Sequence, residues 1–208
     1  MKTLLIVILC LFIGWSLWGY FFSRVEQAEY TVIKKYKDFE IRQYSSRIVA
    51  ETTISNSDFK KSINSGFSIV AGYIFGDNIK QEKISMTAPV MEKSLESEKI
   101  AMTAPVVVDD NKELRTISFV MPKKYTIETL PIPKDSRVKL REIPEQKIAV
   151  LRFSWSRNEK RVQSMKDKLI DILQKENIEI IGSPSYAGYN APGTPPWMIR
   201  NEILVEIK

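Results

Sequence analysis

The sequence predicts an α+β protein in which a duplicated strand–strand–helix unit closes into one sheet or barrel with two amphipathic helices on it, preceded by a transmembrane helix. Three observations predict this fold. The chain opens with a long uncharged apolar run, a strand–strand–helix pattern occurs twice about 100 residues apart, and a nine-residue segment occurs twice, 16 positions apart. Each unit alone would leave one apolar sheet face uncovered. We therefore expect an anchor over residues 1–23 and a single folded domain over residues 24–208.

The apolar run from Thr3 to Phe22 contains 20 residues and no charge. About 20 apolar helical residues span the hydrocarbon core of a bilayer. Trp15 and Trp18 stand near one end of the run, where interfacial aromatic residues occur, and the residues that follow do not resemble a signal-peptidase site. We expect residues 3–22 to contact lipid as an uncleaved single-pass anchor. A cleaved signal peptide and a buried core helix are the alternatives.

Positive charges flank the run on both sides. Lys2 favours an N-terminus inside the cell, whereas Arg24, Lys34 and Lys35 follow the run and favour the opposite orientation. Large domains are translocated largely regardless of such charges. On that ground we expect the domain on the extracytoplasmic side.

The first unit begins with two predicted strands, Glu29–Tyr36 and Phe39–Tyr44, joined by a short turn. Arg47–Ile54 is rich in β-branched residues and predicts a third strand. The spacing of apolar residues then changes to the period of a helix, and Ser57–Phe75 is predicted to be helical. Its apolar side chains recur at spacings of four, four, three and four: Phe59, Ile63, Phe67, Val70 and Ile74.

The second unit repeats this order with strands over Arg137–Ile143 and Lys147–Phe153 and a helix over Arg157–Glu176. Ser156 and Glu159 have the spacing of a capping box. The two units correspond at these positions: Ile41–Arg42 with Leu140–Arg141, Ile48 with Ile148, and Asp58 with Asn158.

A shorter repeat lies between the units. Glu82–Val90 and Glu98–Val106 are identical at eight of nine positions, and apolar and polar residues alternate in both. This alternation is typical of half-buried strands, which would end at the Pro near the end of each copy or lie at a sheet edge. Met86 and Met102 are read either as core filler or as the lining of a ligand groove.

The segment Gly182–Trp197 holds four of the ten Pro and three of the eight Gly, and is predicted to be a loop with large aromatic side chains. Asn201–Ile207 follows as a closing strand. Arg200 and Glu202 at its start are read as a solvated pair, with an inward orientation as the alternative.

Composition excludes several chemistries. The chain has no His and one Cys, Cys10. A Ser-His-Asp triad, a Cys-His dyad, a His-ligated metal, an internal disulfide and a Cys-rich zinc site are thereby excluded. The net charge is +6, but basic residues are scattered among acidic ones. We therefore expect no nucleic-acid partner.

Seven segments of the chain, two of them copies of one motif, carry a resemblance to a known family. They are the doubled KI[SA]MTAPV, Tyr30–Tyr44, Phe119–Pro133, Val138–Pro144, Lys147–Ser154 and Gly188–Ile207. Through these segments the chain resembles the SOUL haem-binding protein family over nearly all of residues 28–208. The resemblance implies a distorted barrel of two pseudo-symmetric units, each with one helix, related to the gyrase-inhibitor-like ligand-binding fold.

The resemblance also implies a cofactor, haem or another tetrapyrrole, held in an apolar groove between the first helix of the domain and a loop near the C-terminus. A porphyrin needs aliphatic and aromatic walls and a cation at the rim for its carboxylates. Met and Tyr are known haem ligands. The residues of this chain that the resemblance places in these roles are Ile63, Phe67, Val70, Ala71, Ile74, Met86, Met102, Tyr189, Trp197 and Arg200.

The chain departs from the family pattern in two respects. Some members use a His axial ligand, which this chain lacks. Other members hold the propionates with basic groove residues, and the matching positions here are Asn64, Gly72 and Thr194. The basic side chains that could substitute are Lys60, Lys61 and Arg200.

These observations predict a membrane-anchored protein that binds haem or a tetrapyrrole without a His axial ligand and is not an enzyme. Two alternatives stay open. The first is a binding module for another amphipathic small molecule or for a protein. The second is a hydrolase in which Glu202, with a pKa raised by burial, acts as general base.

Overall fold

The computed structural model describes residues 1–22, 27–55, 58–79, 90–95, 114–190 and 193–208. In these residues the chain forms three α-helices, α1 (Lys2–Phe22), α2 (Phe59–Ile74) and α3 (Glu159–Lys175), and a 3₁₀ turn, η1 (Pro196–Met198). The strands are β1 (Tyr30–Lys35), β2 (Glu40–Tyr44), β3 (Arg47–Ser55), β4 (Val90–Leu95), β5 (Leu114–Val120), β6 (Lys139–Ile143), β7 (Gln146–Phe153), β8 (Ser185–Gly188) and β9 (Asn201–Glu206).

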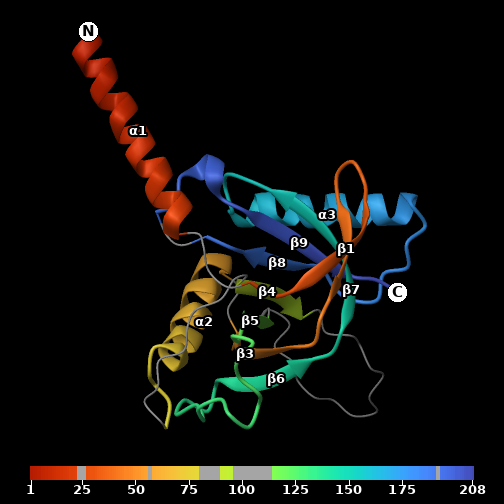
Figure 1. The fold of residues 1–208 in the computed structure, drawn as a ribbon. Coiled ribbons are helices and arrows are strands. Elements are labelled where there is room, and N and C mark those ends of the chain that lie inside the picture. The colour runs from red at the N-terminus through yellow and green to blue at the C-terminus, as the bar shows by residue number, and fades with distance from the viewer. Residues whose placement is uncertain (23–26, 56–57, 80–89, 96–113, 191–192) are drawn as a thin grey trace.

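The strands form one curled antiparallel sheet in the order β1-β2-β7-β9-β8-β4-β5-β3-β6. Figure 1 shows α2 and α3 on this sheet and α1 projecting away from it. The α+β class is confirmed. In the described part of the chain, the sheet is an incompletely closed half-barrel, with β1 and β6 at its edges.

The two predicted units pair with each other. Strand β2 of the first unit pairs with β7 of the second, with Arg42 opposite Ile148, and β3 pairs with β6, with Ile48 opposite Glu142. The strands and helices predicted for both units are confirmed within two residues at each end. Strands β1 and β2 pair within the first unit, but β2 finds its second partner, β7, and β3 finds β6 in the second unit, so the second unit completes the sheet of the first.

Both domain helices begin with equivalent side-chain caps. The Asp58 carboxylate accepts a hydrogen bond from the Lys61 amide at 2.9 Å, and the Asn158 side chain accepts one from the Arg161 amide at 2.9 Å. These caps satisfy amides that have no partner within the helix. The predicted capping box of Ser156 and Glu159 is wrong, because the residue in the extended N-cap conformation is Asn158.

The two helices pack on different parts of the sheet. Helix α3 buries Leu169 and Leu173 in one core cluster, and α2 buries Val70 and Ile74 in another. Gly66 lets α2 approach β5 closely, since a Cβ there would lie 2.6–2.9 Å from three side-chain atoms of Ile117. A residue larger than Gly would push the helix away from the sheet.

The segment predicted as a continuous loop over Gly182–Trp197 contains strand β8, which lies between β4 and β9. That prediction is wrong at Ser185–Gly188. The flanking Pro and Gly residues mark turns, and the four-residue run between them is too short to show a strand period. The strand matters because it carries Tyr186 to the site described below.

Most of the MTAPV repeat lies outside the described residues, including Met86 and Met102. The last residue of its first copy, Val90, begins β4. Strand β4 pairs with β5 on one side and with β8 on the other, so it is an interior strand.

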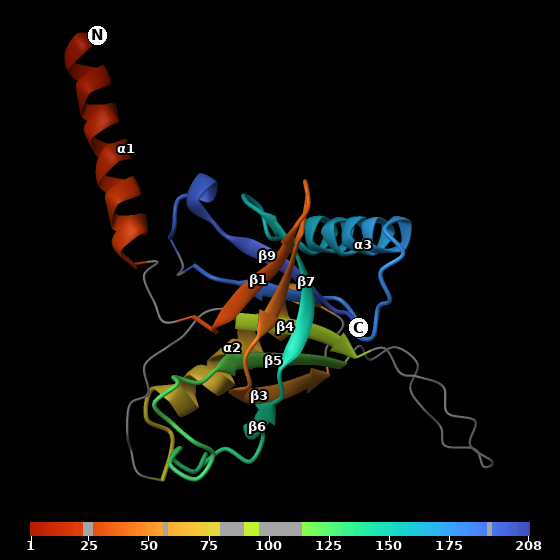
Figure 2. The ribbon, with the colours of Figure 1, turned by 45° about the vertical axis from the view of Figure 1, so that its right-hand side comes forward.

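Helix α1 is long and apolar enough to cross a membrane, by length and composition, over Lys2–Tyr20. Only 6% of its apolar window is buried. Figure 2 shows that it stands clear of the sheet. It is therefore not a core helix of the domain, and a membrane anchor and a signal sequence are the two interpretations that its sequence allows.

Candidate functional site

A cavity of about 1010 Å³ lies between the first turns of α2 and the segment that leads from β7 into α3. Its size is at the upper end of the range for small-molecule sites, about 300–1,000 Å³. Strands β4, β5 and β8 and the residues around η1 supply its other walls. Much of the lining is aliphatic or aromatic, including Phe59, Ile63, Phe67, Ile117, Trp155 and Ile199.

Charged side chains from both helix starts stand at the rim. Lys60 of α2 and Arg157, just before α3, supply exposed positive charge. Glu159 also lines the cavity, and its carboxylate accepts a hydrogen bond from Arg115 at 3.0 Å. Asp58 is engaged as the cap of α2. The rim therefore offers two cations to a ligand that carries carboxylates at one edge.

Trp155 is held in an unusual backbone conformation beside the cavity. Its φ is +73°, in the left-handed region that a bulky residue rarely adopts. Its amide donates to the Pro196 carbonyl at 3.2 Å, and its carbonyl accepts from the Asn201 side chain at 3.4 Å. The Trp155 residue is 58% exposed. Strain of this kind persists where the surroundings impose it, and it often marks a binding site.

The residues that the sequence placed on the helix side of the groove divide into two sets. Ile63 and Phe67 line the cavity, and Phe67 also packs on Phe119 with ring centroids 5.2 Å apart. The other three are buried in the core between α2 and the sheet: Val70, Ala71 and Ile74. The apolar stripe of α2 thus faces the cavity at its N-terminal half and the core at its C-terminal half.

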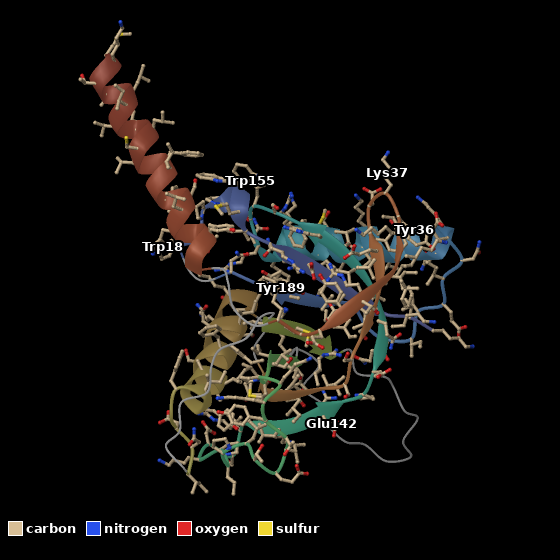
Figure 3. All side chains as sticks on the ribbon, viewed as in Figure 1. Trp18, Tyr36, Lys37, Glu142, Trp155 and Tyr189 are labelled. Atoms are coloured by element: carbon tan, nitrogen blue, oxygen red, sulfur yellow. The ribbon has the colours of Figure 1, made fainter. Side chains whose placement is uncertain are left out.

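The structure places the residues proposed for the opposite wall elsewhere. Tyr189, labelled in Figure 3, directly follows β8; it is buried, and its hydroxyl donates a hydrogen bond to Glu202 at 2.6 Å. Trp197 stacks on Phe12 of α1 with centroids 4.7 Å apart. Their neighbours in the same segment line the cavity instead: Tyr186, Asn190, Pro196 and Ile199.

Met91 on β4 is also among the cavity residues, and no prediction from the sequence included it. It directly follows the first copy of the repeat, so its place in the strand pattern was the available signal. Trp155 was missed as well, since nothing in its local sequence indicates a positive φ.

Comparisons with known proteins decide the family. The family model described as "SOUL heme-binding protein" matches residues 25–206. The chain belongs to the SOUL heme-binding protein family. Among curated proteins, this SOUL chain is similar to "Heme-binding protein 2" of Mus musculus, with 28% identity over 178 residues that cover 82% of each chain. It is also similar to "Heme-binding protein 2" of Homo sapiens, with 28% identity over 156 residues that cover 74% of this chain and 71% of that protein.

Solved structures share the fold of this SOUL domain at low sequence identity. The EcmrR C-terminal domain superposes with a TM-score of 0.57 and 11% identity, covering 86% of this chain and 98% of its own. A hydrolase from Listeria innocua superposes with a TM-score of 0.52 and 12% identity, covering 85% of this chain and 94% of its own. At such identities the likeness shows the fold alone.

A buried ion cluster lies within the sheet of the SOUL domain. Arg42 binds both carboxylate oxygens of Glu202, at 2.8 and 3.0 Å, and Arg200 donates from Nε to the same carboxylate at 2.9 Å. Tyr189 supplies the further hydrogen bond described above. Glu202 is fully buried, so the interpretation of Arg200 and Glu202 as a solvated pair is wrong. The partner that draws them inward, Arg42, lies 160 residues from Glu202 along the chain.

The ion cluster also corrects the prediction of a raised pKa at Glu202. Burial pushes the pKa of Glu202 upward, but the hydrogen bonds and charge of Arg42, together with the charge of Arg200, hold the pKa below its ordinary value. A carboxylate held ionised by two guanidinium groups is a poor proton acceptor near neutral pH. Among the described residues, Glu202 is also not part of the cavity lining.

Proposed function

We propose that this chain is a membrane-anchored protein that binds haem or another tetrapyrrole in the cavity between the starts of α2 and α3, without a His axial ligand. The observation that carries the proposal is the apolar cavity itself, found in a member of a family described as heme-binding. Its aliphatic and aromatic walls match the faces of a large flat macrocycle.

The lining residues match both the apolar macrocycle and the propionate edge of such a ligand. Phe59, Ile63 and Phe67 would contact the macrocycle, and Lys60 and Arg157 at the rim would pair with its propionates. Arg200, proposed from the sequence for that role, is engaged with Glu202. The carboxylates would therefore project from the cavity towards solvent, with the apolar plate inside.

Met91 contributes to the cavity lining, but its side chain packs against the buried cluster that contains Tyr44 and Tyr189, on the other face of β4 from Val90, so we do not assign it as an iron ligand. Met86 and Met102 lie outside the described residues, and their role stays a prediction from the sequence. A bound haem would supply its iron and its absorption; the chain supplies the walls. Since the chain has no His, affinity rests mainly on burial of the macrocycle, at about 25 cal/mol per Å² of apolar surface less the cost of association.

The cavity lies where the two strand–strand–helix units meet. We take these units to be pseudo-symmetric, because their helix caps correspond at Asp58 and Asn158 and their strands pair reciprocally. Such an arrangement brings two equivalent helix starts to one site. It supports a binding role and not catalysis, because the described lining holds no pair of acid and base aligned on a reacting atom.

Residues 1–23 would anchor the protein through α1, with residues 24–208 as the binding domain. The length, apolarity and exposure of α1 support this part of the proposal. The extracytoplasmic position of the domain stays a prediction from the sequence.

The test is an absorption titration of the full chain in detergent with hemin. Binding of hemin shifts the Soret band. Ile63→Glu should lower the affinity for hemin by roughly tenfold or more, because a charge replaces an aliphatic side chain whose burial contributes about 1.5–3 kcal/mol. Ile132→Glu is the matched control, since Ile132 is exposed and lies outside the cavity lining.

A flat titration at micromolar protein would overturn the proposal. Native mass spectrometry of the purified chain then separates the alternatives, because the mass of a co-purifying molecule identifies another amphipathic ligand.

A further inference from the structure

The turn η1 lies between the apolar helix α1 and the cavity and contacts both. On one side Trp197 stacks on Phe12 at 4.7 Å and meets Trp15 edge to face at 5.3 Å. The Trp15 indole also donates to the Gly193 carbonyl at 2.9 Å. On its other side, Pro196 is part of the cavity lining.

The helix packs against this turn closely. A Cβ on Gly19 would lie 2.6 Å from Pro195 Cδ, so Gly19 permits the approach. Phe12, Trp15 and Gly19 are spaced by three and four residues and therefore lie on one face of α1. The contact is thus continuous along the C-terminal half of the helix.

The position of this contact along α1 fixes how near the domain lies to a membrane. At about 1.5 Å per residue, Phe12 is about 15 Å from the end of the helix at Phe22. The hydrocarbon core is about 30 Å thick, so a spanning α1 would bring η1 into the near leaflet, with Trp197 at the depth of Phe12 and Pro195 at the shallower depth of Gly19. Figures 1 and 2 show η1 beside the last turns of α1, while α2 and the β3–β6 edge of the sheet lie beyond its end.

The chemistry of the turn suits that position. Residues 191–199 contain no charge and include three Pro, one Trp, one Met and one Ile. Trp residues concentrate at the boundary between hydrocarbon and water. In Figure 3, Trp155 and Trp18 both lie at the end of the molecule where α1 meets η1.

Trp155 joins the mouth of the cavity to this surface. Its amide is bonded to the Pro196 carbonyl of η1, and it lines the cavity while 58% exposed. In water, a strained backbone that keeps a large indole exposed to solvent brings no evident stabilisation. At an interface the same exposure places an amphipathic ring in its preferred environment.

We propose that the cavity mouth, formed by Trp155 and η1, lies in the bilayer interface, so that a planar apolar ligand passes between cavity and lipid without crossing bulk water. The occupant of this surface is the lipid bilayer. The inference rests on the anchor and the cavity of the proposed function, and adds an orientation of the domain and a route for the ligand.

The orientation is tested without any ligand by quenching of Trp fluorescence in vesicles of phosphatidylcholine brominated near the headgroup end of the acyl chains. Trp155 is retained alone by Trp15→Phe, Trp18→Phe and Trp197→Phe. The control changes all four Trp to Phe and adds Glu142→Trp, on the exposed surface of β6, far from α1 (Figure 3). We expect strong loss of Trp155 emission and none in the control.

Quenching of Trp155 equal to that of the control, in chains that float with the vesicles, would overturn the orientation and leave the anchor standing. Chains that do not float with vesicles would overturn the anchor and the orientation together. Hemin titration in detergent reports on the cavity independently of both outcomes.

The route is tested with vesicles preloaded with hemin and apomyoglobin in the surrounding water. Apomyoglobin captures hemin that leaves the bilayer through water. We expect the anchored chain to acquire its bound spectrum at an undiminished rate. Loss of loading when apomyoglobin is added, in a chain that binds hemin in detergent, would overturn the direct route.

Discussion

Glu202 illustrates how much of this domain depends on single buried charges. Glu202→Gln removes the buried carboxylate that Arg42 and Arg200 share, leaving Arg42 with Glu40 as its remaining acidic partner and Arg200 with none among the ion pairs of the described residues. Breaking a buried pair in this way costs about 3–5 kcal/mol. We expect that loss of unfolding free energy at neutral pH in urea titrations. Glu142→Gln, at an exposed position, should change it little.

The effect should depend on pH in a definite direction. Because the folded pKa of Glu202 lies below its unfolded value, the carboxylate stabilises the fold above the unfolded pKa. That stabilisation is lost as the pH falls through the folded pKa. The difference in stability between the native chain and Glu202→Gln should therefore shrink below about pH 4, near the ordinary Glu pKa. A difference that stays constant would contradict the assignment.

At Trp155 we expect substitution by Gly to leave the protein more stable than substitution by Ala, the reverse of the usual order. A residue with a Cβ pays about 1–2 kcal/mol in the left-handed region, whereas Gly does not. Trp155→Gly should therefore be more stable than Trp155→Ala by about 1 kcal/mol, as measured by thermal unfolding in detergent. Equal stabilities would mean that the positive φ is not imposed by the hydrogen bonds of Trp155 to its neighbours.

The sequence could identify only part of the site at the level of residues. Ile63 and Phe67 were predictable because a helical period shows which side chains share a face. The same period continues through Val70 and Ile74, and nothing local shows where the stripe passes from cavity to core. Arg42 and Glu202 could not be paired in advance, since their contact depends on strands that are distant along the chain.

At the level of elements, the local period of apolar residues predicted the boundaries of both units within two residues, because it acts over a few residues, whereas the capping box proposed at Ser156 and Glu159 was wrong. Strand β8 was missed because a run of four residues between Pro and Gly carries too little pattern. Strand β5 was not predicted either; only its last two residues, Phe119 and Val120, fell in a segment quoted for the family resemblance. Both lie in the middle of the sheet, where pairing on both sides decides the structure.

Gly66 of helix α2 tests whether tight packing against β5 outweighs the higher helix propensity of Ala. Gly66→Ala would ordinarily favour a helix by about 1 kcal/mol. Here the added Cβ would lie 2.6 Å from Ile117 Cδ1, and overpacking in a core costs about 1–3 kcal/mol. We expect a net loss of stability on chemical denaturation.

Gly72→Ala is the matched control on the same helix. Its Cβ would meet only the flexible Asp77 side chain, at 2.9 Å. That side chain can move aside, so this variant should be neutral or more stable. A stabilised Gly66→Ala would show that α2 can shift away from β5 at little cost.

At the scale of the whole molecule, the reciprocal pairing of β2 with β7 and β3 with β6 makes each unit dependent on the other. Val70 lies fully buried under α2 and Leu169 fully buried under α3, in separate core clusters. If the sheet unfolds cooperatively, truncating a core side chain in either cluster must lower the stability measured in one common unfolding transition. The alternative is two units that melt independently.

Val70→Ala and Leu169→Ala should therefore each shift one common unfolding transition. We expect losses of about 2–5 kcal/mol for Leu169→Ala and somewhat less for Val70→Ala, because fewer atoms are removed. Hydrogen exchange measured separately for peptides of α2 and α3 should show both helices losing protection together in both variants. Loss confined to the helix that carries the substitution would mean that strand pairing between the units does not couple them.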